Sequence, residues 1–177
     1  MRHIYRWEKA EAEDFSKIYE LMTEAFPPSE IRNEDGQRNL LSHPAYQLYT
    51  VKNKEEVHGL LAVWMFDTFD FIEHFAVDAS LRGNGIGGML LKDYLENTQK
   101  TVFLEVEEPK TDIAKRRIGF YERAGFCLND DDYIQPDLQK GQSSLLLKNM
   151  TYPHKSSKEE FAHMKQHIFE TVYMIRP

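Results

Sequence analysis

A short glycine-rich segment is the part of this sequence whose residue types point most directly to chemistry. Four of the nine glycines lie in RGNGIGG, residues 82–88, between an apolar run and an amphipathic one. The first turn of a helix has unpaired N–H donors and the positive end of the helix dipole, and glycine lets a ligand approach those donors closely. Arg82 adds a planar charged group that suits phosphate oxygens. A turn that only connected a strand with a helix would need one glycine, so we interpret the segment as a phosphate-binding loop.

Glutamates within apolar stretches are the candidates for acid–base chemistry. In FLEVEE, the residues Phe103, Glu105 and Glu107 alternate with apolar residues, so the two glutamates share one face of a strand. A carboxylate among apolar residues costs free energy unless it has a use, and it can accept a proton from a substrate. Glu73, on a neighbouring strand, is a third candidate. The alternative for each glutamate is an exposed sheet face or an ion pair with Lys or Arg.

The glycine spacing also fits a dinucleotide-binding loop. Gly83-x-Gly85-x-x-Gly88 matches G-x-G-x-x-G, and Glu105 and Glu107 stand near the distance expected of a ribose-binding acid. In that fold the glycines follow a strand of a parallel sheet at once. Here DASLR intervenes, and the preceding strands are expected to be antiparallel. We therefore keep a dinucleotide-dependent oxidoreductase as the weaker alternative, and we exclude a Walker loop because no Gly-Lys-Ser/Thr follows.

The elements that must position these residues are the strands and helices of a mixed sheet. Three apolar or alternating stretches, at 46–51, 58–66 and 69–77, follow one another through short connections and must form an antiparallel meander. A helix that starts in the glycine loop then leads to a strand at 101–106, and this order requires a parallel crossover. The other elements expected are a strand at 3–7, helices at 13–26 and 29–42, a helix from Ile113 that Gly125 ends, strands at 126–134 and 143–150, and a last helix that begins with a capping box of Ser157 and Glu160.

The predicted fold class is therefore α/β (α+β), with a mixed central β-sheet, an antiparallel N-terminal meander, one parallel crossover and helices on both faces. At 177 residues the chain is long enough to bury the core of one domain. We expect residues 1–150 to form that domain and residues 151–177 to add a helical extension to it.

Composition excludes several classes of protein. The net charge of -7 argues against nucleic acid as a partner. The single cysteine, Cys127, rules out a disulfide framework within the chain and a cysteine zinc site, and the histidines form no cluster with a carboxylate, so no metal is expected. The first residues lack the pattern of a signal peptide, and no apolar stretch approaches the ~20 residues of a membrane helix. We therefore expect a cytoplasmic protein with no membrane partner.

Three stretches of the sequence resemble one known family. Arg82-x-x-Gly85-x-Gly87 is the pyrophosphate motif of the acyl-CoA-dependent N-acetyltransferases of the GNAT superfamily, and FIEHFAVDASLRGNGIGGMLL resembles that family's central strand, loop and helix. VFLEVEEP resembles its next strand, and RRIGFYERAGF resembles its tyrosine-containing helix. The resemblance covers residues 46–150 and implies the acyl-CoA N-acyltransferase fold, whereas residues 1–45 match only in the order of elements.

The resemblance also implies roles for particular residues. It makes Tyr121 the acid that protonates the leaving thiolate and Glu105 the base, with Glu73 as the runner-up. A helix tyrosine can instead be purely structural. The resemblance assigns the pyrophosphate of the coenzyme to Arg82, Gly83, Asn84, Gly85, Ile86, Gly87 and Gly88, and the acyl and pantetheine arm to the backbone of Phe75, Ala76 and Val77.

One departure from the family pattern concerns the helix that carries Tyr121. The position where many members have Asn is Ala114, and the position of the usual Ala is Arg117. The contact of that Asn with the coenzyme is therefore either absent or supplied by Thr111 or Asp112. This departure leaves a second class of function open, a catalytically silent acyl-CoA sensor.

The resemblance implies an N-acetyltransferase that moves an acetyl group from acetyl-CoA to a primary amine by direct attack in a ternary complex. The acceptor is expected to be a small-molecule or peptide amine. Carboxylates at 73, 105, 107 and 130–132 would form an acidic entrance that favours a cationic acceptor, such as a polyamine, an aminoglycoside or a lysine-like group. The basic residues 115–117 could contact the adenosine 3′-phosphate, and the last helix could pair two subunits in a homodimer.

Overall fold

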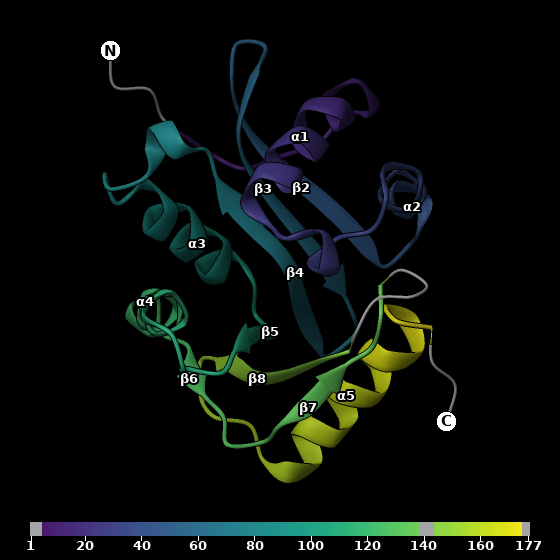
Figure 1. Ribbon diagram of the computed structural model, residues 1–177, viewed down its shortest axis with the longest axis vertical. Helices are drawn as coiled ribbons and strands as arrows, with labels where there is room; N and C mark the ends of the chain where they lie inside the picture. The colour runs from purple at the N-terminus through teal and green to yellow at the C-terminus, as the bar shows by residue number, and fades with distance from the viewer. Residues whose placement is uncertain (1–4, 139–143, 175–177) are drawn as a thin grey trace. The chain divides into compact units, whose positions relative to one another are not determined.

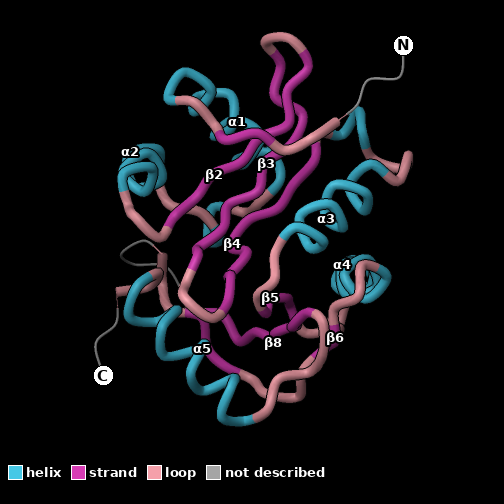
Figure 2. Tube along the Cα trace, turned by 180° about the vertical axis from the view of Figure 1, so that it is seen from behind, coloured by secondary structure: helices cyan, strands magenta, loops and turns pink. Residues whose placement is uncertain are grey.

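The structure is a computed structural model that describes residues 5–138 and 144–174. The chain divides into two compact units, whose elements Figures 1 and 2 show from opposite sides. Unit 1 consists of Met1–Met65 and Glu73–Gln99, and unit 2 consists of Phe66–Ile72 and Lys100–Pro177. Strand β4 (Phe69–Val77) therefore contributes its first part to unit 2 and its second part to unit 1.

Unit 1 contains the predicted antiparallel meander. β2 pairs antiparallel with β1 and β3, and Tyr46 of β2 stands opposite Trp64 of β3. The elements of the unit are β1 (Glu8–Lys9), α1 (Phe15–Ala25), α2 (Glu34–Asn39), β2 (Tyr46–Asn53), β3 (Glu56–Met65), the second part of β4, α3 (Ile86–Asn97), and short 3-10 helices at Ala12–Asp14, Pro28–Glu30, Leu40–Ser42 and Ala79–Leu81.

Helices cover both faces of the strands in unit 1. Tyr46 and Tyr49 are three residues apart on β2, so their side chains point to opposite faces. The Tyr46 ring packs edge-on against Trp64 at a centroid distance of 5.1 Å, on the face where Gln37 of α2 reaches it. The Tyr49 ring lies 6.4 Å from the ring of Tyr94 on α3. The prediction of helices on both faces is confirmed within this unit.

Prolines divide the first helical region. α1 buries its helically spaced apolar residues, as predicted. Phe26 and Pro27 are then extended, because proline cannot continue a helix. The single helix predicted over 29–42 is therefore wrong. The stretch instead contains two short 3-10 helices and α2, which starts anew where the Asn33 side chain accepts a hydrogen bond from the N–H of Gly36.

Unit 2 contains the parallel pair of strands. Phe69–Ile72 of β4 run parallel to β5 (Thr101–Glu107), and β8 (Leu145–Tyr152) pairs antiparallel with β5. β6 (Cys127–Leu128) and β7 (Tyr133–Gln135) both pair antiparallel with β8. The hydrogen-bonded strand order is β1-β2-β3-β4-β5-β8-β6, with β7 also on β8. The sheet is thus mostly antiparallel with one parallel pair, which confirms the predicted fold class.

The last helix, α5 (Lys158–Thr171), covers one face of the strands in unit 2. Phe103 of β5 and Tyr133 of β7 both pack against Phe161 of α5, with ring centroids 6.5 and 6.1 Å away. The start of α5 is the predicted capping box, in which Ser157 and Glu160 each accept a hydrogen bond from the other's backbone N–H. α5 therefore belongs to the core of unit 2.

Gly125 ends α4 (Asp112–Arg123), as predicted. Its φ of 106° lies in the region that favours glycine. A Cβ at this position would also stand 3.0 Å from Cε2 of Tyr152. Both the conformation and the space therefore require glycine here.

The strands predicted nearest the two ends of the chain differ from the structure at their bounds. Residues 5–7 of the strand predicted over 3–7 are not in a strand, and residues 3 and 4 lie outside the described residues. The chain instead pairs at Glu8–Lys9, where Glu8 stands opposite Thr50. The strand predicted over 143–150 is β8, which begins at Leu145, and residue 143 also lies outside the described part. Alternation in the sequence does not fix which residues of a run find a partner strand.

The strand predicted over 126–134 is also wrong, because it is two short strands that both pair with β8, with an irregular segment between them. Asn129 is buried at the start of this segment, and its side-chain amide donates to Asn149 Oδ1 at 2.8 Å and to Thr151 Oγ1 at 3.0 Å. Its own Oδ1 accepts from the N–H of Ser156. These hydrogen bonds hold the irregular segment against β8 and the residues that follow it.

Candidate functional site

In unit 1 the glycine loop follows β4 after the short 3-10 helix Ala79–Leu81. Asp78 caps the short helix Ala79–Leu81, because its Oδ1 accepts a 2.6 Å hydrogen bond from the N–H of Ser80. The exposed Arg82 follows, and its Nε donates to the carbonyl oxygen of Val77 at 3.3 Å. Because this bond uses only Nε, the remaining N–H groups of the guanidinium can meet an anion.

Two glycines of the loop adopt the backbone conformation that glycine permits. Gly83 has φ 83°, and Gly85, the residue before α3, has φ 74°. A Cβ at either position would meet nothing within 4 Å, so the space over both residues is open. The predicted start of a helix inside the loop is confirmed at Ile86.

The main-chain N–H groups of the loop are available to a ligand. Within the described residues, the backbone hydrogen bonds at this point run from the N–H of Arg82 to Ala79 and from the N–H of Met89 to Gly85. The N–H groups of Ile86, Gly87 and Gly88 belong to the first turn of α3, at the positive end of the helix dipole. The loop therefore has the donors, the open space and the charge that a diphosphate needs.

At the end of β4, before the loop, the side chains are packed against other parts of unit 1. The Phe75 ring stands edge-on to Trp7 at 6.2 Å, and Ala76 is 8% exposed. Val77 is half-buried and its carbonyl oxygen accepts the bond from Arg82. Packing therefore explains these side chains, and a role for their backbone in binding the coenzyme remains a prediction.

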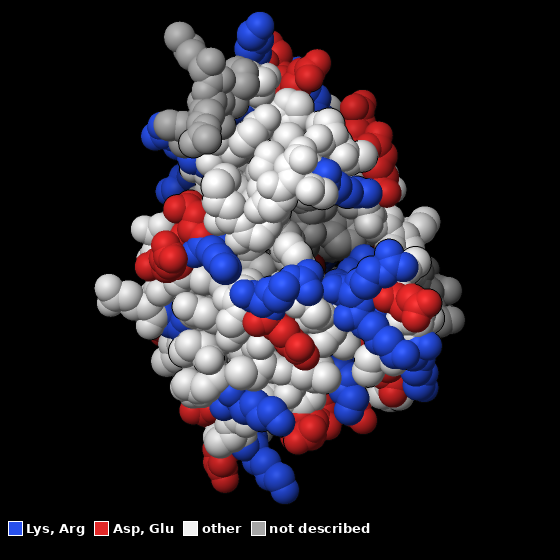
Figure 3. All heavy atoms as spheres, turned by 90° about the vertical axis from the view of Figure 1, so that its left-hand side faces the viewer, with Lys and Arg blue, Asp and Glu red and all other residues white. Residues whose placement is uncertain are grey.

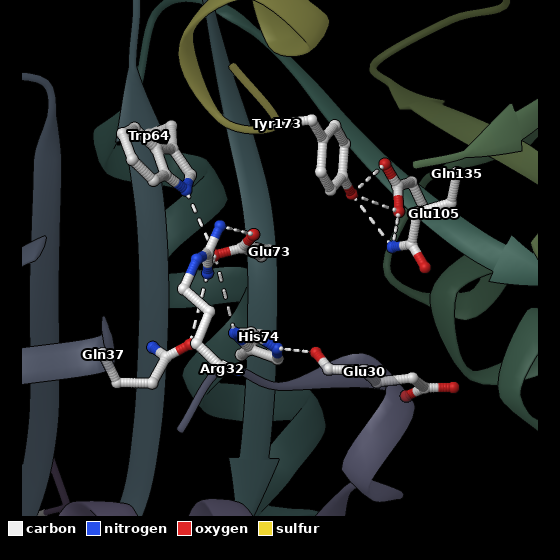
Figure 4. A network of polar contacts seen from close by, with 9 residues as sticks. All are labelled: Glu30, Arg32, Gln37, Trp64, Glu73, His74, Glu105, Gln135 and Tyr173. Atoms are coloured by element: carbon white, nitrogen blue, oxygen red, sulfur yellow. Dashed lines mark hydrogen bonds and ion pairs between the residues drawn. The ribbon is translucent and has the colours of Figure 1, made fainter. Parts of the chain in front are cut away.

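Glu73 lies within a polar network of unit 1 (Figure 4). Arg32, which precedes α2, donates from both Nη atoms to the two carboxylate oxygens at 2.9 and 3.1 Å. The Trp64 indole donates to Oε1 at 3.2 Å. The side chains of Arg32 and Glu73 are only 11% and 4% exposed. Burial raises the pKa of Glu73, but the charge of Arg32 and these hydrogen bonds outweigh it, so the pKa is lowered from its usual value.

His74 connects the same network with the segment that follows α1. Its Nε2 lies 2.7 Å from the carbonyl oxygen of Glu30, and because a carbonyl can only accept, Nε2 carries the proton. Burial lowers the pKa of His74, against the raising effect of Glu73. The buried Nδ1 makes no hydrogen bond within the described residues and stands 3.8 Å from Oε1 of Glu73. The imidazole is therefore neutral at neutral pH.

Glu105 lies in a second cluster, within unit 2 (Figure 4). Gln135 of β7 donates from Nε2 to Oε2 of Glu105 at 2.6 Å and to the hydroxyl of Tyr173 at 2.9 Å. The Tyr173 hydroxyl donates to Oε1 of Glu105 at 2.8 Å. Glu107, which was expected beside Glu105, is exposed at the end of β5. The predicted common face of Phe103 and Glu105 is the face that α5 covers.

Tyr121 is half-buried on α4, where its ring contacts Phe120 and Phe126. Burial raises the pKa of its hydroxyl to about 12, although the charge of Arg117 opposes this. The hydroxyl therefore keeps its proton at neutral pH. Thr111, one of the two candidates for the missing Asn contact, caps α4 by accepting a hydrogen bond from the N–H of Ala114.

The acidic patch expected from the sequence is partly neutralised. Asp132 pairs with Lys148, and Asp130 lies 3.7 Å from Lys155. Figure 3 views the molecule from the left-hand side of Figure 1, where α4 lies, and shows Lys and Arg side chains gathered on this face. Lys115 of α4 is exposed. A contact of residues 115–117 with a 3′-phosphate remains a prediction.

Two further observations concern the predictions about metal binding and membrane-spanning helices. His163 and His167 of α5 have ring centroids 4.4 Å apart and pack near Phe69. Over residues 5–138 and 144–174 there is no group of three or more His, Cys, Asp or Glu side chains that could hold a metal ion. None of the helices in these ranges has the length and apolar character that a membrane span requires.

Sequence reasoning missed Arg32, Gln135 and Tyr173. Each contacts its glutamate across a long stretch of chain, and such a contact leaves no local pattern. The one available signal was Tyr173 itself, which directly follows the apolar face of the last helix at Val172.

Comparisons with known proteins bear on the family of the chain. The model of the Acetyltransferase (GNAT) family matches residues 7–126. A relative from Bacillus subtilis (strain 168), named "Putative acetyltransferase YjbC", is 28% identical over 160 residues, which are 88% of this chain and 80% of the relative. A solved structure described as "Putative acetyltransferase from GNAT family from Bacteroides thetaiotaomicron" is 29% identical, with a TM-score of 0.89 over 97% of this chain and 99% of that chain.

A second solved structure is an acetyltransferase of Bacillus subtilis in complex with CoA. It has a TM-score of 0.59 over 84% of this chain and 97% of that chain, and at 20% identity the likeness shows the fold alone. The family model, in contrast, covers more than half of the chain and includes the glycine loop, Glu105 and Tyr121. The chain therefore belongs to the acetyltransferase (GNAT) family and is an acetyltransferase.

Proposed function

We propose that this enzyme transfers an acetyl group from acetyl-CoA to the primary amine of a small molecule or peptide, by direct attack in a ternary complex. The observation that carries the proposal is the loop between β4 and α3, where Gly83 and Gly85 leave open space over the start of a helix. A diphosphate, which CoA carries, suits these donors. We further propose that residues 1–150 form the acetyltransferase domain and that residues 151–177 extend it.

The residues of unit 1 bind and orient the coenzyme in this proposal. Arg82 and the main-chain N–H groups from Gly83 to Gly88 hold the diphosphate. The backbone of Phe75, Ala76 and Val77 orients the acyl arm and donates to the carbonyl oxygen as that oxygen gains negative charge. When bound, acetyl-CoA supplies an activated thioester.

Glu105 is the base of this proposal. A primary amine is protonated at neutral pH and must lose a proton before its nitrogen can attack. Glu105 is held by the amide of Gln135 and the hydroxyl of Tyr173, which are both neutral donors. Glu73, the other candidate, forms a bidentate ion pair with Arg32 that lowers its pKa and makes it the weaker base. We assign Glu73 a structural role.

Tyr121 is the acid. Because its pKa is raised to about 12, the hydroxyl still has its proton at neutral pH and can give it to the departing sulfur. In the Tyr121→Phe variant we expect kcat to fall about 100-fold while the Kd for acetyl-CoA stays the same. Equal losses in kcat and in affinity would overturn this assignment.

Binding and turnover together test the proposal. Acetyl-CoA should raise the Tm of the enzyme, and NAD should not, because a ligand that binds only the folded state stabilises it. Mass spectrometry of a panel of polyamines, aminoglycosides and lysine peptides should then show an acetylated amine together with free CoA. Stabilisation by acetyl-CoA without release of CoA across the panel would instead favour the acyl-CoA sensor.

A further inference from the structure

The cluster around Glu105 is built from parts of the chain that the family model does not match. The match ends at residue 126, whereas Gln135 is on β7 and Tyr173 follows α5. We infer that Gln135 and Tyr173 are positioning residues, which hold the Glu105 carboxylate in the orientation in which it accepts a proton. This inference rests on the proposed function, because it requires Glu105 to be the base.

The hydrogen bonds of the cluster have a defined direction. The Tyr173 hydroxyl accepts from Nε2 of Gln135 at 2.9 Å, so its own proton is directed at Glu105, with distances of 2.8 Å to Oε1 and 3.0 Å to Oε2. The same Nε2 donates to Oε2 at 2.6 Å. Both carboxylate oxygens are thereby fixed.

Tyr173 is held in position by contacts with the last turn of α5. The backbone N–H of Tyr173 bonds to the carbonyl oxygen of Ile168, which is 1% exposed in the core beneath α5. Its ring stands edge-on to Phe169 at 5.9 Å. α5 has already ended at Thr171, and Met174, with φ 58°, has a left-handed conformation that does not continue a helix. Tyr173 and Gln135 are each only 9% exposed, so both donors are held by the core of unit 2.

Among the described residues, Tyr133 of β7 and Tyr173 in the segment after α5 are titratable groups that face Glu105. Burial, followed by the charge of Glu105 and by Tyr173, raises the pKa of Tyr133 well above its usual value. Tyr133 therefore stays protonated and uncharged at neutral pH. A hydrogen bond from a neutral donor such as Gln135 or Tyr173 orients a carboxylate and stabilises its charge less than a hydrogen bond from a cation does.

A double-mutant cycle tests whether Tyr173 acts through Glu105. The variants are Tyr173→Phe, Glu105→Gln and the pair, with kcat, the KM for the amine and the Kd for acetyl-CoA measured for each. We expect Glu105→Gln to lower kcat about 1000-fold and Tyr173→Phe to lower it about 10-fold, with little change in KM or Kd. In the Glu105→Gln background, Tyr173→Phe should change kcat by less than about twofold.

A second variant and a matched control guard against a general loss of structure. Gln135→Met removes the other donor and should lower kcat by a similar factor. Tyr152→Phe removes a hydroxyl from the opposite face of β8, where the ring packs against Phe126, and should leave kcat unchanged. Far-ultraviolet circular dichroism and Tm report the fold of each variant. The acid limb of the pH profile of kcat/KM should move to higher pH in Tyr173→Phe, because the ionised carboxylate loses a donor.

The outcomes separate this inference from the proposed function. A tenfold loss from Tyr173→Phe that persists in the Glu105→Gln background would show a merely structural tyrosine and overturn the inference. The inference would also be overturned if kcat and the pH profile were unchanged in both Tyr173→Phe and Gln135→Met while Glu105→Gln is inactive. Full activity in Glu105→Gln would instead remove Glu105 as the base, and with it the proposed mechanism. If kcat of Glu105→Gln is too low to measure, the pH profile of Tyr173→Phe decides whether Tyr173 acts through Glu105.

Discussion

The two glutamates proposed from the sequence as bases are held by different kinds of group. In unit 1, Glu73 forms a bidentate ion pair with Arg32, and both side chains are nearly buried. In unit 2, Glu105 accepts hydrogen bonds from an amide and a phenol, Gln135 and Tyr173. A guanidinium strongly favours the ionised carboxylate, whereas neutral donors chiefly orient it. A glutamate thus forms a structural ion pair in unit 1, and another glutamate is a candidate base in unit 2.

The largest effect on stability should come from breaking the charged pair. Arg32→Met leaves a buried carboxylate without its cation, and we expect the free energy of unfolding to fall by about 3 kcal/mol. Gln135→Met, the matched change beside Glu105, removes a neutral donor and should cost about 1 kcal/mol. Urea denaturation measures both values. Equal losses in the two variants would mean that the two glutamates are not held differently.

A change in the glycine loop should affect binding but not chemistry. In Gly85→Ala the new Cβ meets open space, but the left-handed backbone disfavours alanine by about 1 kcal/mol. We therefore expect acetyl-CoA to bind about fivefold more weakly, with kcat at saturation retained. Isothermal titration calorimetry and saturation kinetics give the two quantities. Gly119→Ala, where a Cβ meets only the end of the flexible Arg123 side chain, is the control and should leave the affinity unchanged.

The smallest effect should be a pH dependence of stability that comes from unit 1. The pKa of His74 is lowered by burial from the ordinary 6.5, so below about pH 6.5 the unfolded chain takes up a proton that the folded chain does not. Unfolding is then favoured as the pH falls. Glu73, whose pKa is also lowered, loses its contribution at still lower pH.

The test compares Tm at about pH 7.5 and about pH 5.5 in the wild type and in His74→Gln. Glutamine can still donate to the carbonyl oxygen of Glu30 but does not titrate. Tm should fall with pH in the wild type and fall less in the variant. Identical curves would show that the buried histidine does not contribute to this dependence.

The sequence was sufficient to predict the features that rest on local rules. The start of a helix inside the glycine loop and the capping box of Ser157 and Glu160 are short-range patterns, and both are confirmed. The helix predicted over 29–42 failed because its polar sequence has no apolar face, so Pro27 and the cap at Asn33 decided the structure. Patterns of that kind do not show which residues meet in the folded chain.

The partners of the two glutamates illustrate that limit. Arg32 reaches Glu73 over 41 residues, and Tyr173 reaches Glu105 over 68 residues. Both glutamates were visible as carboxylates in apolar strands, but the cation beside one and the neutral donors beside the other depend on tertiary packing. The sequence therefore identified the candidates for the base without distinguishing between them.

The proposed reaction is tested most directly by mixing the enzyme, saturated with acetyl-CoA, with and without an acceptor amine, and following the protein and the products by rapid-quench mass spectrometry. Direct attack predicts that the enzyme itself stays unmodified, and that acetylated amine and free CoA appear together only when the amine is present. An acetylated enzyme that forms with acetyl-CoA alone and then passes its acetyl group to the amine would contradict the account.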